Sequence, residues 1–383
     1  MKVLHICVCG PVTDGWNYQE NMLTKYHSKF GHDVTLLAPQ WAWGTNGKVE
    51  KNKSSNYRNQ DGVQIIRLPI IGKKEIFNSF KRYIGFYNVI EEISPDIIFV
   101  HNIQFIDIVN IVKYARKSSV KIYVDNHADF SNSARTLMAK IFYKVVWRFL
   151  AKKIEPFIEK FYGVLPSRVD FIKAMYRVNP EKVELLVMGA DDDEVLKASD
   201  LRIKRLLREK HKINENDFLI VTGGKIDEFK MQTLLLMQAV KRIDNKNVKL
   251  LVFGSVADNL KEKLYSLCDG EKIQYIGWVN AADSYKYFAI ADLVVFPGRH
   301  SIFWEQVVGQ GIPMICKYWD GSSHIDLGGN VEFIYQDTVD SIYCKIMDVI
   351  MTPNKIIEMK KVAEKEGMKY FSYKNISERS ILQ

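Results

Sequence analysis

The sequence lacks any apolar run near the roughly 18 to 20 residues that a helix needs to cross a bilayer, which argues against an integral membrane protein. Its N-terminus enters a strand-like run after a single lysine and does not show the pattern of a secretory signal peptide. No recognisable nucleic-acid-binding motif is present either. These absences predict a cytoplasmic protein and argue against nucleic acid as its partner.

Cysteine is scarce and scattered, with only five in the chain. Cys7 and Cys9 lie two residues apart on a predicted strand, so their side chains point to opposite faces and should not pair. The others are Cys268, Cys316 and Cys344. We therefore expect free thiols in a reducing compartment.

The chain does contain enough apolar material for a substantial core. Of its 383 residues, 47% are apolar and 26% are charged, a balance typical of globular proteins. This length is sufficient for two domains of ordinary size. The formal net charge of +9 predicts an anionic partner, such as an anionic substrate, an anionic membrane surface or nucleic acid.

Strand-like and helix-like segments alternate along both halves of the chain. In the first half, the predicted strands cover residues 3–8, 33–37, 63–68, 97–100, 121–124 and 162–165. The predicted helices between them cover residues 16–30, 76–93, 105–115 and 134–154. In the second half, the predicted strands cover residues 218–221, 249–253, 273–276, 293–296 and 313–316. Two final helices are predicted over residues 339–350 and 354–370.

This alternation predicts parallel sheets that are covered by helices on both faces. We therefore expect an α/β protein of two Rossmann-like, doubly wound domains facing across a cleft, with ligands beyond the carboxyl ends of the strands. The boundary is expected beside Met188-Gly189-Ala190. It gives an N-terminal domain over residues 1–190 and a second domain over residues 191–368.

A cluster of glycine and lysine follows the first strand of the second half. Gly223, Gly224 and Lys225 come directly after the apolar run, and Lys230 precedes a helical stretch over residues 231–243. Glycine lets the backbone turn sharply and approach a ligand closely. The N-terminus of a helix offers free N–H groups and partial positive charge, to which the two lysines add full charges. The pattern suits a diphosphate, although a turn with solvated lysines is the alternative.

Turn residues also end the strands that follow, at residues 252–254, 276–279 and 291–297. With these features the chain resembles, over essentially its whole length, the GT-B glycosyltransferases of family 4, which are retaining enzymes that use nucleotide-sugars. In that family the corresponding strand ends in Gly-Arg-Leu, with a lysine further on. The resemblance implies that Lys225 and Lys230, beside Gly224, hold the donor diphosphate and stabilise the departing nucleotide.

The N-terminal half also resembles this family. Residues 5–37, with Gly15-Trp16 and Gly31 to Val34, look like its first βαβ unit. By resemblance, Gly15 belongs to the donor-binding residues and, with His127, meets the acceptor. The backbone near Val279 is implied in donor binding as well. A C-terminal helix over residues 369–383 is implied to cross back to the first domain.

One loop departs from the family pattern. The family usually carries two glutamates in a loop and following helix that grip the donor, whereas residues 298–306 form a shorter segment without the first glutamate. The second glutamate's place falls on Gln306, with Glu305 one residue earlier. The segment resembles a subgroup in which His300, Ser301 and helix-start amides such as that of Ile302 hold donor phosphate or sugar. Glu305 is implied to reach the nucleotide ribose, and an exposed carboxylate at a helix start is the alternative.

Two histidines follow predicted strands of the first half, His101 after residues 97–100 and His127 after Asp125-Asn126, which end the strand-like run 121–124. Strand ends line the ligand crevice of a parallel sheet, although a lone histidine is more often structural. By resemblance His127 lies close to the transferred sugar, where imidazole can donate to a hydroxyl or move a proton. His127 is therefore the favoured catalytic histidine, and His101 is the weaker candidate.

Three consecutive aspartates, Asp191 to Asp193, raise the question of a metal, since carboxylates bind Mg²⁺ or Mn²⁺ beside a diphosphate. They lie at the predicted domain junction and far along the chain from the lysines. A solvated hinge is the favoured interpretation. Because the lysines can neutralise phosphate, we expect no metal and no other cofactor.

Basic and apolar residues combine in two helical stretches. Residues 135–154 place Lys140, Lys144, Arg148 and Lys152 at four-residue spacing beside apolar side chains, and residues 73–83 are also basic and aromatic. Either helix alone could be an ordinary surface helix. Together with the net charge they favour peripheral binding to an anionic membrane surface.

The sequence thus predicts a glycosyltransferase, an enzyme that moves a sugar from a nucleotide-diphosphate-sugar to a glycan or lipid-linked acceptor in surface polysaccharide synthesis. By resemblance the reaction retains the anomeric configuration. Two alternatives stay open. One is a nucleotide-sugar epimerase of GT-B fold, which needs no acceptor, and the other is a non-catalytic protein that binds anionic surfaces.

Overall fold

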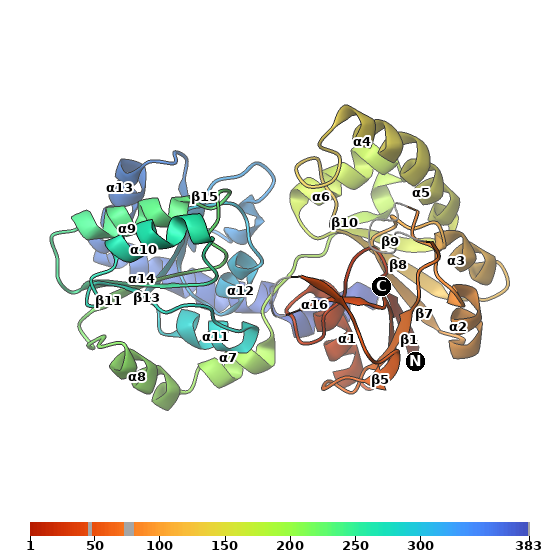
Figure 1. Ribbon diagram of the computed structural model, residues 1–383, viewed down its shortest axis with the longest axis horizontal. Helices are drawn as coiled ribbons and strands as arrows, with labels where there is room; N and C mark the ends of the chain where they lie inside the picture. Colours follow the sequence, from red (N-terminus) through yellow and green to blue (C-terminus); the bar gives the residue numbers. More distant parts are fainter. Residues whose placement is uncertain (45–47, 73–79, 382–383) are drawn as a thin grey trace. The chain divides into compact units, whose positions relative to one another are not determined.

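The computed structural model describes residues 1–44, 48–72 and 80–381. The chain forms two compact units (Figure 1). Unit 1 comprises Met1–Val187 and Ile376–Gln383, and unit 2 comprises Met188–Asn375. The chain therefore passes between the units twice, once beside the boundary expected at residue 190 and once within its last helix.

Unit 1 is built on an eight-stranded sheet with the strand order β10-β9-β8-β7-β1-β2-β6-β5. All neighbouring pairs are parallel except β5 with β6. The strands are β1 (Lys2–Ile6), β2 (Asp33–Pro39), β5 (Asn56–Arg58), β6 (Gln64–Leu68), β7 (Ile97–His101), β8 (Lys121–Asn126), β9 (Ile158–Gly163) and β10 (Val183–Leu185). A separate hairpin joins β3 (Trp41–Trp43) to β4 (Val49–Lys51). The order of the sheet reverses between β1 and β7.

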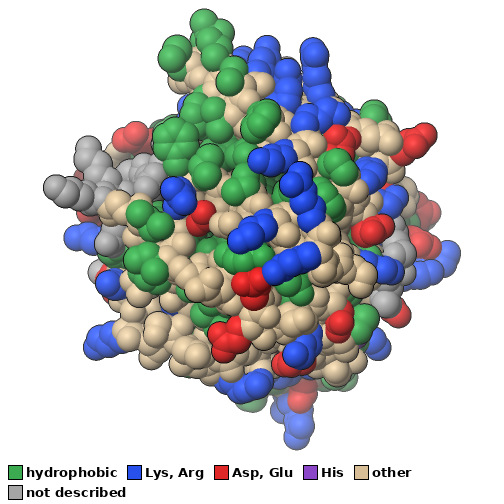
Figure 2. Space-filling view, turned by 90° about the vertical axis from the view of Figure 1, so that its right-hand side faces the viewer, with side chains coloured by type: hydrophobic (Ala, Val, Ile, Leu, Met, Phe, Trp, Pro, Cys, Tyr) green, Lys and Arg blue, Asp and Glu red, His purple; other side chains and the backbone are tan. Residues whose placement is uncertain are grey.

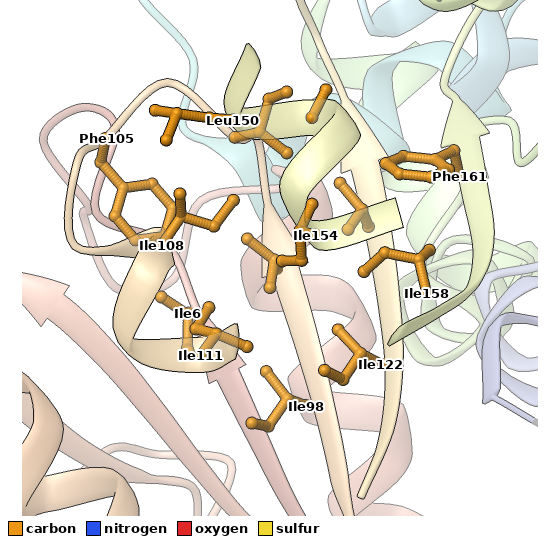
Figure 3. Close-up of a cluster of buried hydrophobic side chains, with 14 of the residues drawn as sticks. Ile6, Ile98, Phe105, Ile108, Ile111, Ile122, Leu150, Ile154, Ile158 and Phe161 are labelled. Carbon is orange, nitrogen blue, oxygen red and sulfur yellow. The ribbon is translucent and has the colours of Figure 1, made fainter. Parts of the chain in front are cut away.

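The helices of unit 1 pack on both faces of this sheet. They are α1 (Gln19–Lys29), α2 (Phe86–Ile93), α3 (Ile108–Ala115), α4 (Leu137–Phe142), α5 (Arg148–Ile154), α6 (Pro166–Phe171) and, from the C-terminus, α16 (Tyr373–Ile381). Figure 3 shows part of the core, in which Ile111 and Ile154 from α3 and α5 lie over Ile6, Ile98 and Ile122 of the strands. This burial of β-branched side chains is the main stabilising contribution to the sheet.

Unit 2 contains a six-stranded, fully parallel sheet with the order β13-β12-β11-β14-β15-β16. Its strands are β11 (Phe218–Gly223), β12 (Val248–Phe253), β13 (Ile273–Tyr275), β14 (Leu293–Phe296), β15 (Met314–Lys317) and β16 (Val331–Ile334). Its helices are α7 (Asp192–Ala198), α8 (Leu201–Lys210), α9 (Gln232–Arg242), α10 (Lys261–Leu267), α11 (Ala281–Ala289), α12 (Phe303–Gly309), α13 (Val339–Ile350), α14 (Pro353–Val362) and α15 (Met368–Tyr370). In strand order this is the doubly wound Rossmann arrangement, with a switch point between β11 and β14.

Most predicted elements are present, with shifted ends. The strand predicted at 162–165 instead begins at Ile158, where its backbone pairs with β8. The prediction missed this start because Glu159 and Lys160 interrupt the apolar pattern of the sequence. The helix predicted over residues 134–154 is divided into α4, a π-helical turn over residues 143–147, and α5. The first residues of the helix predicted over 76–93 lie outside the described residues. Residues 80–85 are not helical, since Tyr83 forms an antiparallel bridge with Ile70, and the helix α2 begins only at Phe86.

The aspartate run at the unit boundary is not a solvated hinge. Asp191 is buried, and its side chain accepts a hydrogen bond from the backbone N–H of Asp193 at the start of α7. Asp192 accepts from the Ser372 hydroxyl at 2.6 Å and from the backbone N–H of Lys374 at 2.9 Å. These carboxylates therefore cap a helix and hold the returning C-terminal segment.

No described helix has the length and apolar character needed to cross a bilayer. The cysteines in the structure are all free thiols. Both findings concern the described part of the chain.

Candidate functional site

Three glycines meet at the carboxyl edge of the unit 2 sheet, where β11, β12 and β13 end. The backbone N–H of Gly254 donates to the carbonyl of Gly277 at 2.7 Å, and that of Gly224 donates to the carbonyl of Phe253 at 3.1 Å. A Cβ atom on Gly254, whose φ is +129°, would lie 1.8 Å from the carbonyl oxygen of Gly224. Only glycine fits there, so the backbone itself forms this part of the edge.

Three cationic side chains gather beside this glycine edge. The Lys225 side chain is 67% exposed, and its ammonium lies 3.2 Å from a carboxylate oxygen of Asp227. Burial lowers the pKa of Lys230; nearby Lys225 and Arg299 lower it further, and Asp227 opposes them. The guanidinium of Arg299 lies over the ring of Phe229, 5.3 Å from its centre. The mutual repulsion of these cations would be relieved by a bound anion.

Arg299 was not among the residues predicted from sequence, because it lies far along the chain from the two lysines. Strands β11 and β14 are neighbours in the sheet, so the loops after them share the switch point. The start of α9 lies next to Lys230, as predicted, with the helix beginning at Gln232. The sequence signal for Arg299 is its place directly after β14, the strand that must adjoin β11 in a Rossmann order.

The loop after β14 holds a buried carboxylate between two histidines. Oε1 of Glu305 is 2.7 Å from Nε2 of His300 and 3.0 Å from Nε2 of His324. Burial would raise the pKa of the Glu305 carboxyl, but His300 and His324 outweigh burial and lower it to about 2. The Glu305 side chain has no exposed surface, so the alternative of an exposed helix-start carboxylate is wrong. His300 is the more exposed of the two histidines.

The remaining predicted residues of unit 2 lie around this loop. Ser301 and Ile302 start α12, since their carbonyls accept from the backbone N–H groups of Trp304 and Gln306 at 2.9 and 3.2 Å. The Gln306 side chain is buried and donates to the Ser284 hydroxyl at 3.0 Å. Val279 is half-buried and directly precedes Asn280, the N-cap of α11. Gln306 thus points into the interior, and Val279 follows the end of β13.

In unit 1, His127 follows β8, one strand beyond β7 at the switch point. Its backbone N–H donates to the side-chain oxygen of Asn102 at 2.8 Å. Its Nε2 lies 3.2 Å from Oδ1 of Asp125, which is fully buried, while the His127 side chain is 27% exposed. Gly15 lies in the loop after β1 with φ +75°, an exposed position in unit 1. The structure thus places Gly15 and His127 in unit 1, and the lysines in unit 2.

His101, the weaker candidate, is buried. Its Nδ1 lies 2.7 Å from Oδ2 of Asp125. Among the described residues, His101, Asp125 and His127 bring donor atoms within 4.8 Å of one another, a spacing that also suits a metal ion. Because the 2.7 Å separation is that of a charge-assisted hydrogen bond, we assign these groups to a proton-linked cluster.

The comparisons with known proteins agree with this fold. Residues 203–310 match the family model of the glycosyl transferases group 1. A glycosyltransferase from Rickettsia africae ESF-5 superimposes with a TM-score of 0.71 at 13% identity, over 99% of this chain and 96% of that one. Anabaena Alr3699/HepE in complex with UDP-glucose gives 0.65 at 12% identity, over 99% and 98%. No curated protein matches the chain.

A putative UDP-N-acetylglucosamine 2-epimerase from Listeria monocytogenes is similar to the same extent, with a TM-score of 0.65 at 12% identity over 99% of this chain and 95% of that one. The predicted fold, two Rossmann-like domains of the GT-B kind, is confirmed. The family match bears out the predicted resemblance to group 1 glycosyltransferases, and with it the expectation of a glycosyltransferase. The matched segment contains Lys225, Lys230, Arg299 and Glu305.

Proposed function

We propose that this protein transfers a sugar from a nucleoside-diphosphate sugar, held by unit 2, to an acceptor that is met by unit 1. The observation that carries the proposal is the gathering of Lys225, Lys230 and Arg299 at the glycine edge beside α9. Cations, backbone N–H groups and a helix N-terminus are together suited to a diphosphate. Their charge would stabilise the diphosphate as it leaves the sugar, so the proposed chemistry requires no metal.

The loop after β14 would contact the donor through His300. Glu305 is hydrogen-bonded to Nε2 of His300 and also to Nε2 of His324, so the orientation of the His300 imidazole is fixed. We therefore assign Glu305 to positioning of His300, in place of the direct ribose contact that the resemblance implies. Ser301 and Ile302 would add backbone contacts, and the backbone near Val279 would line the same edge. The reaction is proposed to retain the anomeric configuration, with catalysis mainly from charge stabilisation and positioning.

An exposed apolar face on α4, α5 and the π-helical turn between them supports a lipid-linked acceptor at a membrane surface. Its exposed side chains are Leu137, Met138, Ile141, Val145 and Phe149. Figure 2 shows apolar side chains with Lys and Arg side chains beside them on this side of unit 1. Arg148 and Lys152 bond within the protein, to the Met175 carbonyl and to Glu155, which leaves Lys140 and Lys144 to face anionic lipid. The second predicted basic stretch lies largely outside the described residues.

The donor is tested first by a thermal-shift screen against nucleotide-sugars, since a ligand that binds only the native state raises its stability. Calorimetry then compares wild type with the double variant Lys225→Ala, Lys230→Ala. We expect the double variant to lose donor binding while it keeps its fold. A matched control is Lys241→Ala with Lys246→Ala, which removes the same charge in the last turn of α9 and just beyond it, at the opposite end of the helix. Retained affinity in the first variant contradicts the assignment.

The two alternatives are separated by product analysis with the donor found in the screen. Donor loss that depends on an added acceptor supports transfer. Conversion of the donor without any acceptor supports the epimerase, whose fold is also close. Vesicle binding without any nucleotide binding supports the non-catalytic surface protein.

A further inference from the structure

A chain of buried histidines runs through unit 1 from the C-terminal helix to Asp125. We call His27, His5 and His101 the histidine chain. Its contacts join the Ser377 carbonyl and Ser380 hydroxyl to His27 Nε2 (both 3.0 Å), His27 Nδ1 to His5 Nε2 (2.9 Å), His5 Nδ1 to His101 Nε2 (3.0 Å), and His101 Nδ1 to Asp125 Oδ2 (2.7 Å). All of these side chains lie in the interior.

The period of the strands explains how the sequence builds this chain. Leu4 and Ile6 of β1 face the apolar core, so His5 between them faces the other side of the sheet. The same alternation places His101 of β7 and Asp125 of β8 on that side, where they are directly paired in register. Helices α1 and α16 supply His27 and the two serines. The C-terminal segment therefore completes a polar network that the first strands begin.

The first contact fixes the direction of the hydrogen bonds. A backbone carbonyl can only accept, so Nε2 of His27 must donate to Ser377. The Ser380 hydroxyl donates its own proton to the same carbonyl at 2.8 Å, so its oxygen also accepts from His27. Burial lowers the pKa of His27 to about 4 and that of His5 well below its usual value, so both rings are neutral near pH 7.

A neutral imidazole has one donor and one acceptor, so the direction propagates along the chain. With His27 Nε2 donating, its Nδ1 must accept from His5, and Nδ1 of His5 must then accept from Nε2 of His101. A neutral His101 would turn the lone pair of Nδ1 towards the Asp125 carboxylate at 2.7 Å. Two lone pairs repel at this distance. The contact between His101 Nδ1 and Asp125 Oδ2 is therefore favourable only if one further proton lies between these two atoms.

We propose that the histidine chain holds His101 as an imidazolium against an ionised Asp125, and that this pair positions His127 with Nε2–H towards the carboxylate. Burial alone would raise the pKa of Asp125, but His101 and His127 together hold it well below its usual range, so the carboxylate is ionised. The pair is neutral as a whole, which removes most of the cost of burying either charge.

His127 then presents Nδ1, with its lone pair, to a ligand. Its Nε2 lies 3.2 Å from Oδ1 of Asp125, and Oδ1 has no aligned hydrogen bond in the described structure. Contacts of this kind tighten when a substrate binds. The inference deepens the proposed function, on which its last step rests: Nδ1 of His127 would accept a hydrogen bond from a sugar or acceptor hydroxyl. His5, His27 and His101 are positioning residues, since they act through Asp125.

Other ionisable groups surround this cluster. Glu20 of α1 acts on His101 and His127, and burial raises the pKa of its carboxyl. Burial also raises the pKa values of the Cys7 and Cys9 thiols, which therefore stay neutral near pH 7. Lys81 donates to the Cys9 carbonyl and adds a positive charge near both thiols. After Asp125, Glu20 is thus the second carboxyl near His127 whose ionisation a pH profile of sugar transfer will report.

The direct test is nitrogen NMR of the whole protein, with ¹⁵N-labelled histidine and single substitutions for assignment. At pH 7.5 (about one unit above the usual histidine pKa) we expect His5 and His27 as neutral Nε2–H tautomers and His101 as an imidazolium. This readout requires no substrate, so it stands even if sugar transfer is not found. A neutral His101, or His5 as the Nδ1–H tautomer, would overturn the proposal.

The substitution His27→Phe gives a second test. It removes His27 Nδ1, the acceptor that fixes the tautomer of His5. His5 can then become the Nδ1–H tautomer and donate to Nε2 of His101. In that arrangement His101 is neutral and keeps a single proton, on Nδ1, towards Asp125. We expect the imidazolium signal of His101 to disappear, and kcat to fall about tenfold, a fraction of a general base's contribution, with KM for the donor unchanged.

The matched control is Ser377→Ala, which keeps the accepting carbonyl and removes a hydroxyl that has no hydrogen-bond partner in the described structure. We expect this variant to behave as wild type in both readouts. An unchanged His101 signal in His27→Phe contradicts the proposal. If His27→Phe does not fold, the tautomers of the wild-type protein still decide.

Discussion

The two units contain the same chemical arrangement in different surroundings. In each, a fully buried carboxylate lies between one buried histidine and one partly exposed histidine. These are His101, Asp125 and His127 in unit 1, and His324, Glu305 and His300 in unit 2. In each, the partly exposed histidine lies beyond the carboxyl end of a strand, where ligands bind parallel sheets.

The difference lies behind the buried histidine. Nε2 of His101 continues into the histidine chain, whereas Nδ1 of His324 is buried without a hydrogen-bond partner among the described residues. The protonation of the unit 1 group is therefore set from a distance by a backbone carbonyl. That of the unit 2 group depends on Glu305 and on whatever binds beside His300. The same arrangement can therefore have a fixed protonation state in one unit and a protonation state that changes with the bound ligand in the other.

The largest effect should come from removing either buried carboxylate's charge. Breaking a buried ion pair costs roughly 3 to 5 kcal/mol, because the partner's charge is left uncompensated. We expect Asp125→Asn to lose more unfolding free energy than Glu305→Gln, since it also removes the negative charge against which the histidine chain holds His101 as an imidazolium. Urea denaturation at pH 7 measures both. Equal losses would show that the histidine chain does not add to the stabilisation that Asp125 provides.

Acid should destabilise the protein partly through Glu305. Its pKa is about 2 in the folded state against 4.5 ordinarily, so its stabilising contribution is present above pH 4.5 and is lost as the pH falls towards 2. The expected loss is roughly 3 kcal/mol by linkage. Unfolding curves of wild type and Glu305→Gln, recorded between these values, should converge as the pH falls. Parallel curves would contradict a folded-state pKa near 2.

The apolar face of unit 1 should bind anionic lipid, and the exposed leucines of unit 2 should not. We expect Val145→Asp with Phe149→Asp to lower partitioning onto vesicles containing an anionic phospholipid by about tenfold, since apolar area and charge both drive such binding. Leu196→Asp with Leu201→Asp in unit 2 is the matched control, because these leucines are even more exposed than Val145 and Phe149. Cosedimentation measures both. An equal loss of vesicle binding in the unit 2 variant would contradict a specific role of the apolar face of unit 1.

The smallest effect should follow removal of divalent cations. Since Lys225, Lys230 and Arg299 supply the positive charge proposed for the diphosphate, EDTA should leave donor affinity and transfer rate unchanged. Calorimetry and product assays with and without the chelator measure this. A loss that Mg²⁺ or Mn²⁺ restores would mean that the cation cluster alone does not neutralise the donor.

The sequence predicts the fold well where strands are long and apolar. It does not predict β10 or β16, because Val183–Leu185 and Val331–Ile334 are short and carry a glutamate within each. Such strands form because a neighbouring strand offers hydrogen bonds, which is a property of the assembled sheet.

The candidate site is predicted in part for a similar reason. Lys225 and Lys230 are close in sequence and follow a glycine turn, so local pattern is sufficient. Arg299 and the histidine chain are brought together by strands that are distant in sequence. His5 and His101 become neighbours only because β1 and β7 adjoin at the switch point. A Rossmann strand order applied to the predicted strands would have paired them.

The central claim is that unit 2 binds the donor and unit 1 positions the reaction. It is tested most directly by nucleoside-diphosphate calorimetry on two variants side by side, His127→Ala and the double variant Lys225→Ala, Lys230→Ala. We predict wild-type affinity with lost transfer for His127→Ala, and lost affinity for the double variant. Lost affinity in His127→Ala together with wild-type affinity in the double variant would contradict the account.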